Sequence, residues 1–138
     1  MITTAIDTNI ILDILTGTPQ ETLQSSAAIK AAKLAGPVSI SILVYAEVTS
    51  NFASQARADD FFGLINCRVT SIDEPTAFLA GQFFQEYKRR GGTRTRILPD
   101  FLIAAHAQLH ANRLLTRDKR FFRENFPKLK AVSPADLT

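Results

Sequence analysis

This chain of 138 residues has one cysteine and no apolar run long enough to cross a membrane. A lone cysteine, Cys67, excludes an internal disulfide, and its neighbours indicate the edge of a buried strand rather than a reactive thiol. The apolar stretches are interrupted by acidic or hydroxyl residues well before the roughly 20 residues that span a bilayer, and no basic segment precedes the first of them. These absences favour a cytoplasmic protein that does not enter a membrane.

Internal repeats and low-complexity tracts are also absent. With 46% hydrophobic residues, the chain is long enough for one domain with a real core and too short for two comfortable ones. We therefore expect residues 1–138 to form a single domain.

Positive charge is scarce in the first part of the chain and abundant in the last. Residues 1–87 carry four Lys/Arg against nine Asp/Glu, a net charge of −5, whereas residues 88–138 carry twelve against four, a net charge of +8. The asymmetry favours an anionic partner for the C-terminal part, although a solvated basic face is the commoner cause of such a bias.

Short β-branched runs alternate with stretches of helical period along the chain. The expected strands are 2–6, 38–40, 67–72, 114–115 and 129–132. The expected helices cover about 10–15, 21–34, 42–52, 56–65, 75–87 and 99–112, with a short one after Asp118. Because parallel strands need crossover connections, the alternation predicts an α/β fold with a parallel sheet and helices on both faces. Active sites of such sheets lie beyond the carboxyl ends of the strands.

Four acidic residues occupy positions that a soluble domain would usually avoid, namely Asp7, Glu47, Asp100 and Asp118. No lysine or arginine lies in the apolar runs around the first three, so a desolvated carboxylate there has no local cation. The three aspartates each lie near a helix start, where helix capping is an adequate explanation for any one of them. Glu47 lies about two turns into its helix, beyond any cap, and is either a partly solvated glutamate or a site residue.

The four acids together are more informative than any one of them. Carboxylates gathered at the mouth of an α/β sheet supply oxygen ligands for one or two Mg²⁺ or Mn²⁺ ions, and such ions bind phosphate oxygens and activate water. The pattern therefore predicts hydrolysis of a phosphodiester with metal assistance.

At these residues the chain resembles the PIN-domain nucleases, and within them the VapC-like toxins of bacterial toxin–antitoxin pairs. The matching segments are AIDTNIILDIL, SILVYAEV, LPDFLIAAHA and LLTRDKRFF, in that order along the chain. The resemblance implies a three-layer α/β/α sandwich with a central, mainly parallel sheet, and an endoribonuclease that depends on Mg²⁺ or Mn²⁺. It also implies a cognate antitoxin, catalytic roles for all four acids, and Asp7 and Asp100 as the firmest metal ligands.

Small polar residues beside the acids suit the same chemistry. Asn9 and Thr116 are candidates for orienting a carboxylate or a metal-bound water, with ordinary turn chemistry as the alternative, which we favour for Thr8. Arg94 and Arg96, in a Gly-containing segment expected to be an exposed, mobile loop, are candidates for contacts with RNA phosphates.

Two further polar features favour structural roles. Asp13 lies almost two turns past Asp7, where a helix-edge role is favoured. His106 and His110 share a helix face, but the segment between them lacks the glutamate of a zinc-protease helix, and the chain has no other histidine for a zinc site.

Two other functions compete with the nuclease. A phosphatase of the haloacid dehalogenase type also begins with an aspartate at a strand end, but it needs a second acid two residues later, where this chain has Asn9. A non-catalytic binding module with a degenerate acidic site would require missing acids, and all four are present. The helices rich in Ala, Leu and Phe, including the pairs Phe61-Phe62 and Phe83-Phe84, offer apolar surface for a homodimer.

Overall fold

A computed structural model, which describes residues 1–93 and 98–138, contains one five-stranded sheet in the order β3-β2-β1-β4-β5. All four strand pairs are parallel. The strands are β1 (Thr4–Ile6), β2 (Val38–Ser41), β3 (Cys67–Thr70), β4 (Arg113–Leu115) and β5 (Ala131–Val132). The first strand of the chain therefore lies in the middle of the sheet, between β2 and β4.

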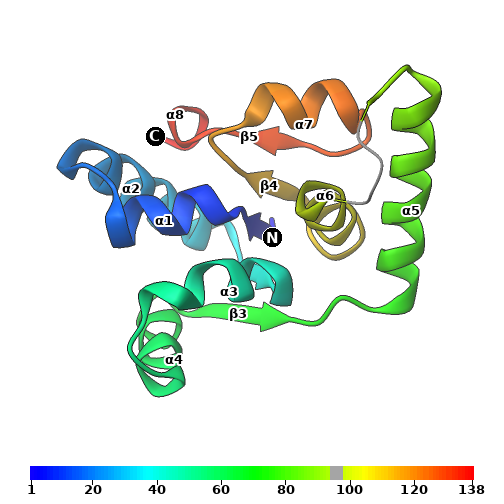
Figure 1. Ribbon diagram of the computed structural model, residues 1–138. Coiled ribbons are helices and arrows are strands. Elements are labelled where there is room, and N and C mark those ends of the chain that lie inside the picture. The colour runs from blue at the N-terminus through cyan, green and yellow to red at the C-terminus, as the bar shows by residue number, and fades with distance from the viewer. Residues whose placement is uncertain (94–97) are drawn as a thin grey trace.

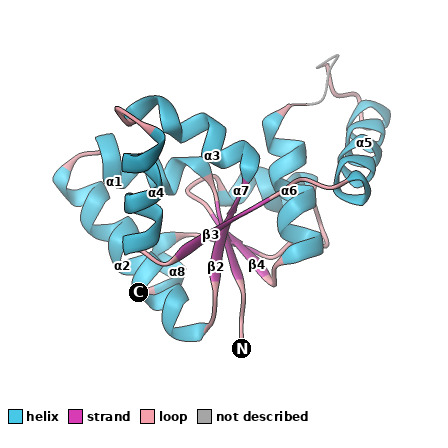
Figure 2. Cartoon of the chain, turned by 90° about the horizontal axis from the view of Figure 1, so that it is seen from below, coloured by secondary structure: helices cyan, strands magenta, loops and turns pink. Residues whose placement is uncertain are grey.

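Helices connect the strands and cover both faces of the sheet (Figure 1). They are α1 (Thr8–Thr16), α2 (Pro19–Ala35), α3 (Ile42–Val48), α4 (Gln55–Leu64), α5 (Glu74–Arg89), α6 (Pro99–His110), α7 (Lys119–Asn125) and α8 (Pro134–Leu137). Figure 2 shows α1 and α2 on one side of the crossing strands and α5 and α6 on the other. The predicted three-layer α/β/α sandwich with a parallel sheet is confirmed.

Several element boundaries differ from those expected. The helix expected to reach residue 52 ends at Val48 and continues as a 3₁₀ turn over Thr49–Asn51. There the Asn51 side chain bonds the Val48 carbonyl, and the Thr49 hydroxyl bonds the Ala46 carbonyl. Short polar side chains that bond nearby carbonyls compete with the helical ladder, which explains the early end.

Two differences concern the ends of the chain's last elements. The strand expected over 129–132 is limited to Ala131–Val132, although Leu129 is buried beside it. Helix α8 was not expected, yet its signal was present, because Ser133 and Asp136 form a capping box around Pro134.

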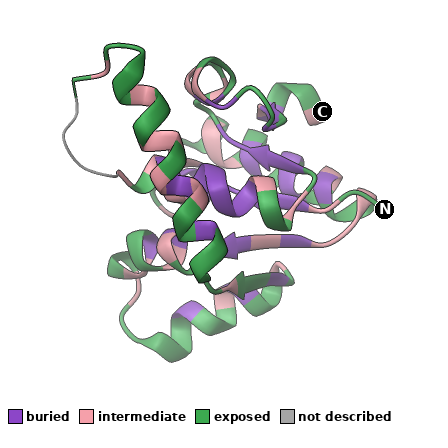
Figure 3. Ribbon diagram, turned by 90° about the vertical axis from the view of Figure 1, so that its right-hand side faces the viewer, coloured by how far each residue is buried: buried purple, intermediate pink, exposed green. Residues whose placement is uncertain are grey.

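Buried side chains follow the strands and the inner faces of the helices (Figure 3). Cys67 lies among them, and burial raises the pKa of its thiol to about 12, so it is not a reactive thiol at neutral pH. The expectation that the phenylalanine pairs offer free surface is wrong for Phe62, which is 3% exposed, whereas Phe78 on α5 is 68% exposed. Within residues 1–93 and 98–138, no helix combines the length and apolarity needed to cross a membrane.

Contacts at the C-terminus of α6 determine how that helix is placed along the sheet. Directly after α6, the Asn112 side chain and amide bond Thr3, which precedes β1, so the C-terminus of α6 lies at the amino edge of the sheet. Because a helix of 12 residues extends about 18 Å, the N-terminus of α6 lies near the opposite, carboxyl edge. Asp100 is thereby brought to the edge where β1, β2 and β4 end.

Candidate acidic site

Asp7 lies at the centre of the candidate site because it follows the central strand directly. It is the N-cap of α1, its side chain is in a residue that is 5% exposed, and its backbone amide donates to the Leu115 carbonyl of β4. One carboxylate oxygen, Oδ1, accepts a hydrogen bond from the Thr8 amide at 2.7 Å, and Oδ2 accepts one from the Thr116 hydroxyl at 2.7 Å. Both described donors are neutral groups.

The surroundings of Asp7 disfavour its charge. Burial, the largest cause, raises the pKa of Asp7 from 3.8 to about 6. The hydrogen bonds from Thr116 and Thr8 oppose that rise, whereas repulsion from the carboxylates of Asp100 and Glu47 adds to it. Asp100 and Glu47 therefore lie near enough to Asp7 to act on its charge.

Glu47 reaches the site from α3, which follows β2 and contacts both α1 and α6. The Thr8 hydroxyl donates to Glu47 Oε1 at 2.7 Å. Thr8 therefore links two acids, since its amide bonds Asp7 while its hydroxyl bonds Glu47. The expectation of ordinary turn chemistry for Thr8 therefore misses its bond to Glu47, because nothing in the sequence near Thr8 indicates a partner 39 residues away.

Asp100 enters from the first turn of α6, directly after Pro99. A proline suits a first helical turn, where its missing amide leaves no helical bond unmade, and an aspartate there interacts favourably with the helix dipole. Asp100 is half-buried and Glu47 is exposed, so both are more accessible to solvent than Asp7.

Asp118 is joined to the site through the backbone rather than through its carboxylate. Its amide donates to the Thr116 hydroxyl oxygen at 2.9 Å, and its exposed side chain makes no capping bond at the start of α7. The Thr116 hydroxyl also receives a long bond of 3.5 Å from the Asn9 side chain, whose oxygen accepts from the Arg117 amide. Thr116, fully buried, is thus the common partner of Asp7, Asn9 and Asp118.

A second buried carboxylate, Asp13, lies on the same helix with a different partner. Asp13 is 8% exposed, forms a close ion pair with the Arg117 guanidinium, and accepts a bond from the Ser25 hydroxyl at 2.6 Å. The guanidinium also bonds the Gln24 side chain at 3.2 Å. The favoured structural reading of Asp13 agrees with this contact, and the pair anchors the segment between Thr116 and Asp118.

The donor chemistry of the acidic site fits a hard divalent cation. All its candidate ligands are carboxylate oxygens, and each oxygen of Asp7 accepts one described hydrogen bond and keeps capacity for another contact. Among the described residues, no three His, Cys, Asp or Glu side chains form a ready-made metal cage. Mg²⁺ usually binds through one or two carboxylates and keeps several waters.

Other candidate residues are not brought to this site. Arg94 and Arg96 lie outside the described residues. His106 is buried against Thr70, 2.5 Å from its hydroxyl, and burial lowers the pKa of His106 to about 4. His110 contacts Thr76 and Asp73 instead, which leaves the two histidines as packing groups between α6 and its neighbours.

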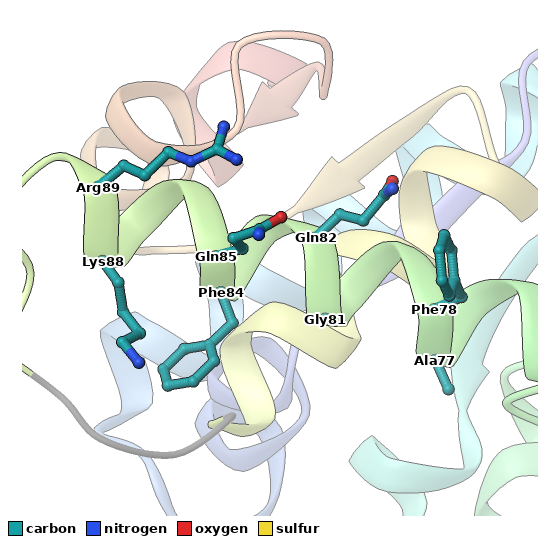
Figure 4. Close-up of a pocket in the computed structure, with 8 residues that line it drawn as sticks. All are labelled: Ala77, Phe78, Gly81, Gln82, Phe84, Gln85, Lys88 and Arg89. Carbon is teal, nitrogen blue, oxygen red and sulfur yellow. The ribbon is translucent and has the colours of Figure 1, made fainter.

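A surface hollow along α5 also lies away from the acids. Its described lining residues all belong to that helix (Figure 4). It contains Phe78 and Phe84 and the cations Lys88 and Arg89, with no carboxylate. It therefore offers no ligand for a metal.

The chain is similar to known proteins over most of its length. The family model described as the PIN domain matches residues 4–126. No curated protein matches the chain. A solved toxin–antitoxin complex from Klebsiella pneumoniae is 25% identical, covers 95% of this chain and 97% of its own, and has a TM-score of 0.67.

Two more distant solved structures share the fold. VapBC2 from Rickettsia felis, bound to a DNA fragment from its promoter, is 20% identical, covers 95% of this chain and 98% of its own, and has a TM-score of 0.70. VapBC-1 from nontypeable Haemophilus influenzae is 20% identical, covers 96% and 98%, and has a TM-score of 0.69.

Proposed function

This chain belongs to the PIN-domain family, and from that premise we propose that it is a metal-dependent endoribonuclease, the toxin of a toxin–antitoxin pair. The similar chain from Klebsiella pneumoniae comes from a toxin–antitoxin complex, which supports the second half of the proposal. A cytoplasmic location, where RNA is available, belongs to the same proposal.

The observation that carries the proposal is the setting of Asp7. Its carboxylate is buried, repelled by Asp100 and Glu47, and bonded by neutral donors in the described structure. Such a group retains its charge at neutral pH only at a free-energy cost, and a divalent cation removes that cost. Mg²⁺ or Mn²⁺, when bound, would activate a water and offset negative charge on the scissile phosphate.

Each polar residue then has a stated task. We assign Asp7 and Asp100 as the principal ligands, with Asp118 in a supporting role. Thr116 and the Thr8 amide hold the two oxygens of Asp7 in place, and the Thr8 hydroxyl holds Glu47 Oε1. Glu47 Oε2 is thereby oriented to accept a proton from the attacking water, while the leaving sugar oxygen gains a proton from solvent.

Cleavage of RNA by the purified protein tests the proposal. We expect cutting with Mg²⁺ or Mn²⁺, none with chelator, and a loss of at least about 10³-fold for Asp7→Ala and for Asp100→Ala. Asp60→Ala, at an exposed position of α4, is the matched control and should keep full activity. Full activity of the Asp7→Ala/Asp100→Ala double variant would falsify the site assignment.

A phosphatase acting on small molecules is the alternative enzyme, and it needs a second acid two positions after Asp7. That residue is Asn9, an amide without a carboxyl proton, and its side-chain oxygen accepts from the Arg117 amide. Hydrolysis of a small phosphoester without action on RNA would favour that phosphatase. Calorimetry that detects no binding of Mn²⁺ would favour a binding module instead.

The proposed partners are a cognate antitoxin and a second copy of this chain. Expression of the chain alone should inhibit growth, Asp100→Asn should remove the inhibition, and a small antitoxin encoded beside it should restore growth. The exposed Phe78 in the α5 hollow is apolar surface suited to a homodimer. Light scattering of the wild type and of Phe78→Glu measures dimerisation separately from toxicity.

A further inference from the structure

At its β5 edge the sheet lies beside α7 and α8 (Figure 1), and a second group of charged residues lies there. They line one hollow of about 510 Å³ to which α7, β4, the approach to β5 and α8 all contribute. Its charged residues are the cations Arg113, Lys119, Arg123 and Lys130 and a single carboxylate, Asp136. The acids of the candidate active site do not line it.

The single carboxylate of this hollow is already engaged. Asp136 Oδ2 accepts from Lys119 Nζ at 2.8 Å and from the Ser133 amide at 2.8 Å. The bond from Lys119 is the main reason that the pKa of Asp136 falls to about 2. Asp136 therefore offsets one cation, and the hollow keeps a positive excess.

Arg113 gives the hollow a fixed cation. Its residue is only 8% exposed, and its Nε donates at 2.9 Å to the hydroxyl of Thr4, a neutral partner. Within the described structure its other guanidinium nitrogens make no hydrogen bond and are not fully enclosed, so they reach solvent in the hollow. A guanidinium held by packing, with donors still available, is suited to binding a phosphate group.

Arg123 and Lys130 extend the positive surface outward. Both are exposed, and neither forms an ion pair in the part of the chain that the structure describes. Lys119 and Arg123 also line a neighbouring hollow on α7. Lys119 directly follows Asp118, so the start of α7 is the part of the hollow that is nearest to a candidate acid along the chain.

The separation suits a bound strand rather than the scissile phosphate itself. Arg113 lies at the start of β4, three residues before Thr116, so the Cα atoms of these two residues are about 10 Å apart along the strand. We propose that this hollow binds a backbone phosphate of the RNA substrate, a few nucleotides from the cleaved bond. The identity of the ligand rests on the proposed function, whereas its chemistry rests on the cations.

Binding of a labelled single-stranded RNA in the presence of chelator, without cleavage, tests the proposal. We expect Arg123→Glu/Lys130→Glu to raise the Kd at least tenfold and to reduce the slope of log K against log salt by roughly 0.7, because losing one single-strand phosphate contact changes that slope by about 0.7. The control is Lys30→Glu/Arg57→Glu, which makes the same charge change at exposed positions of α2 and α4.

Each outcome is decisive. Equal weakening by the two double variants, or no weakening by either, overturns the proposal, as does a variant that loses affinity for the antitoxin but not for RNA. If Arg123→Glu/Lys130→Glu weakens RNA binding and lowers its salt dependence, but the wild type cuts no RNA, the phosphate site is supported and the proposed function is contradicted. If the wild type cuts RNA but Arg123→Glu/Lys130→Glu binds RNA as the control does, the proposed function is supported and the phosphate site is contradicted.

Discussion

Helix α1 carries two buried carboxylates, Asp7 at its start and Asp13 one turn before its end, and their partners differ. Asp13 has a cation, because Arg117 pairs with it closely and Ser25 adds a hydrogen bond. Asp7 is bonded by an amide and a hydroxyl and is repelled by two further acids. The fold thus supplies an arginine to Asp13, and only neutral described donors to Asp7, the carboxylate that we propose as a metal ligand.

Breaking the Asp13 pair should have the largest effect on stability. Arg117→Met leaves a buried carboxylate without its cation, for which we expect a loss of about 4 kcal/mol in the free energy of unfolding. Urea denaturation measures it. Arg120→Met is the control, because Arg120 pairs with Glu124 on the exposed surface of α7 and should cost less than about 1 kcal/mol. Equal losses would remove the distinction between the two carboxylates of α1.

Removing the charge of Asp7 should increase the free energy of unfolding, whereas breaking the Asp13 pair lowers it. The rise of its pKa from 3.8 to about 6 corresponds to about 3 kcal/mol of unfavourable free energy above pH 6. Asp7→Asn should therefore stabilise the metal-free protein by up to about 3 kcal/mol at pH 7.5 while abolishing cleavage. Asp13→Asn, measured in the same way, should destabilise it; a loss of stability in both variants would contradict the comparison.

The pH dependence sharpens the same point. Because the folded pKa of Asp7 lies above its unfolded value, the native state holds the extra proton between about pH 4 and pH 6, and the wild type loses stability as pH rises through that window. Asp7→Asn lacks this contribution, so the difference between the two proteins should be near zero below pH 4 and largest above pH 6. Parallel denaturation curves in chelator, with a constant difference at every pH, would refute the shifted pKa.

The smallest expected effect concerns Thr116. Thr116→Val removes the hydroxyl that bonds Asp7 and accepts from the Asp118 amide, and we expect a loss of about 1 kcal/mol together with roughly tenfold slower cleavage. Thr16→Val, which removes an exposed hydroxyl bonded to its own helix, is the matched control. If both variants cleave RNA at the wild-type rate, Thr116 does not position the site.

The sequence predicted which acids lie at strand ends better than it predicted the side-chain contacts between residues far apart in the chain. Asp7 and Asp118 lie where the alternation of strands and helices places them, because that alternation determines the parallel sheet and its carboxyl edge. The bond from Thr8 to Glu47 and the pair of Asp13 with Arg117 join residues 39 and 104 positions apart. Local spacing carries no information on such pairs, since they depend on how α1, α3 and the segment after β4 pack together.

The basic bias of the C-terminal part was visible as a count but not as a surface. Lys119 forms an ion pair with Asp136, and Arg120 forms one with Glu124. Arg123 and Lys130 form no ion pair in the described structure. Only the folded arrangement separates the cations that are paired from those that face the hollow beside β5.

The central position of β1 also has a consequence for synthesis of the chain. In the folded chain β1 pairs with β2 at residues 38–39, but its other neighbour, β4, begins at residue 113. Domains form progressively while the ribosome elongates the chain, so Asp7 meets Thr116 only after most of the protein has been made. Until residue 116 has been made, a nascent chain therefore carries Asp7 without the hydroxyl that bonds one of its carboxylate oxygens.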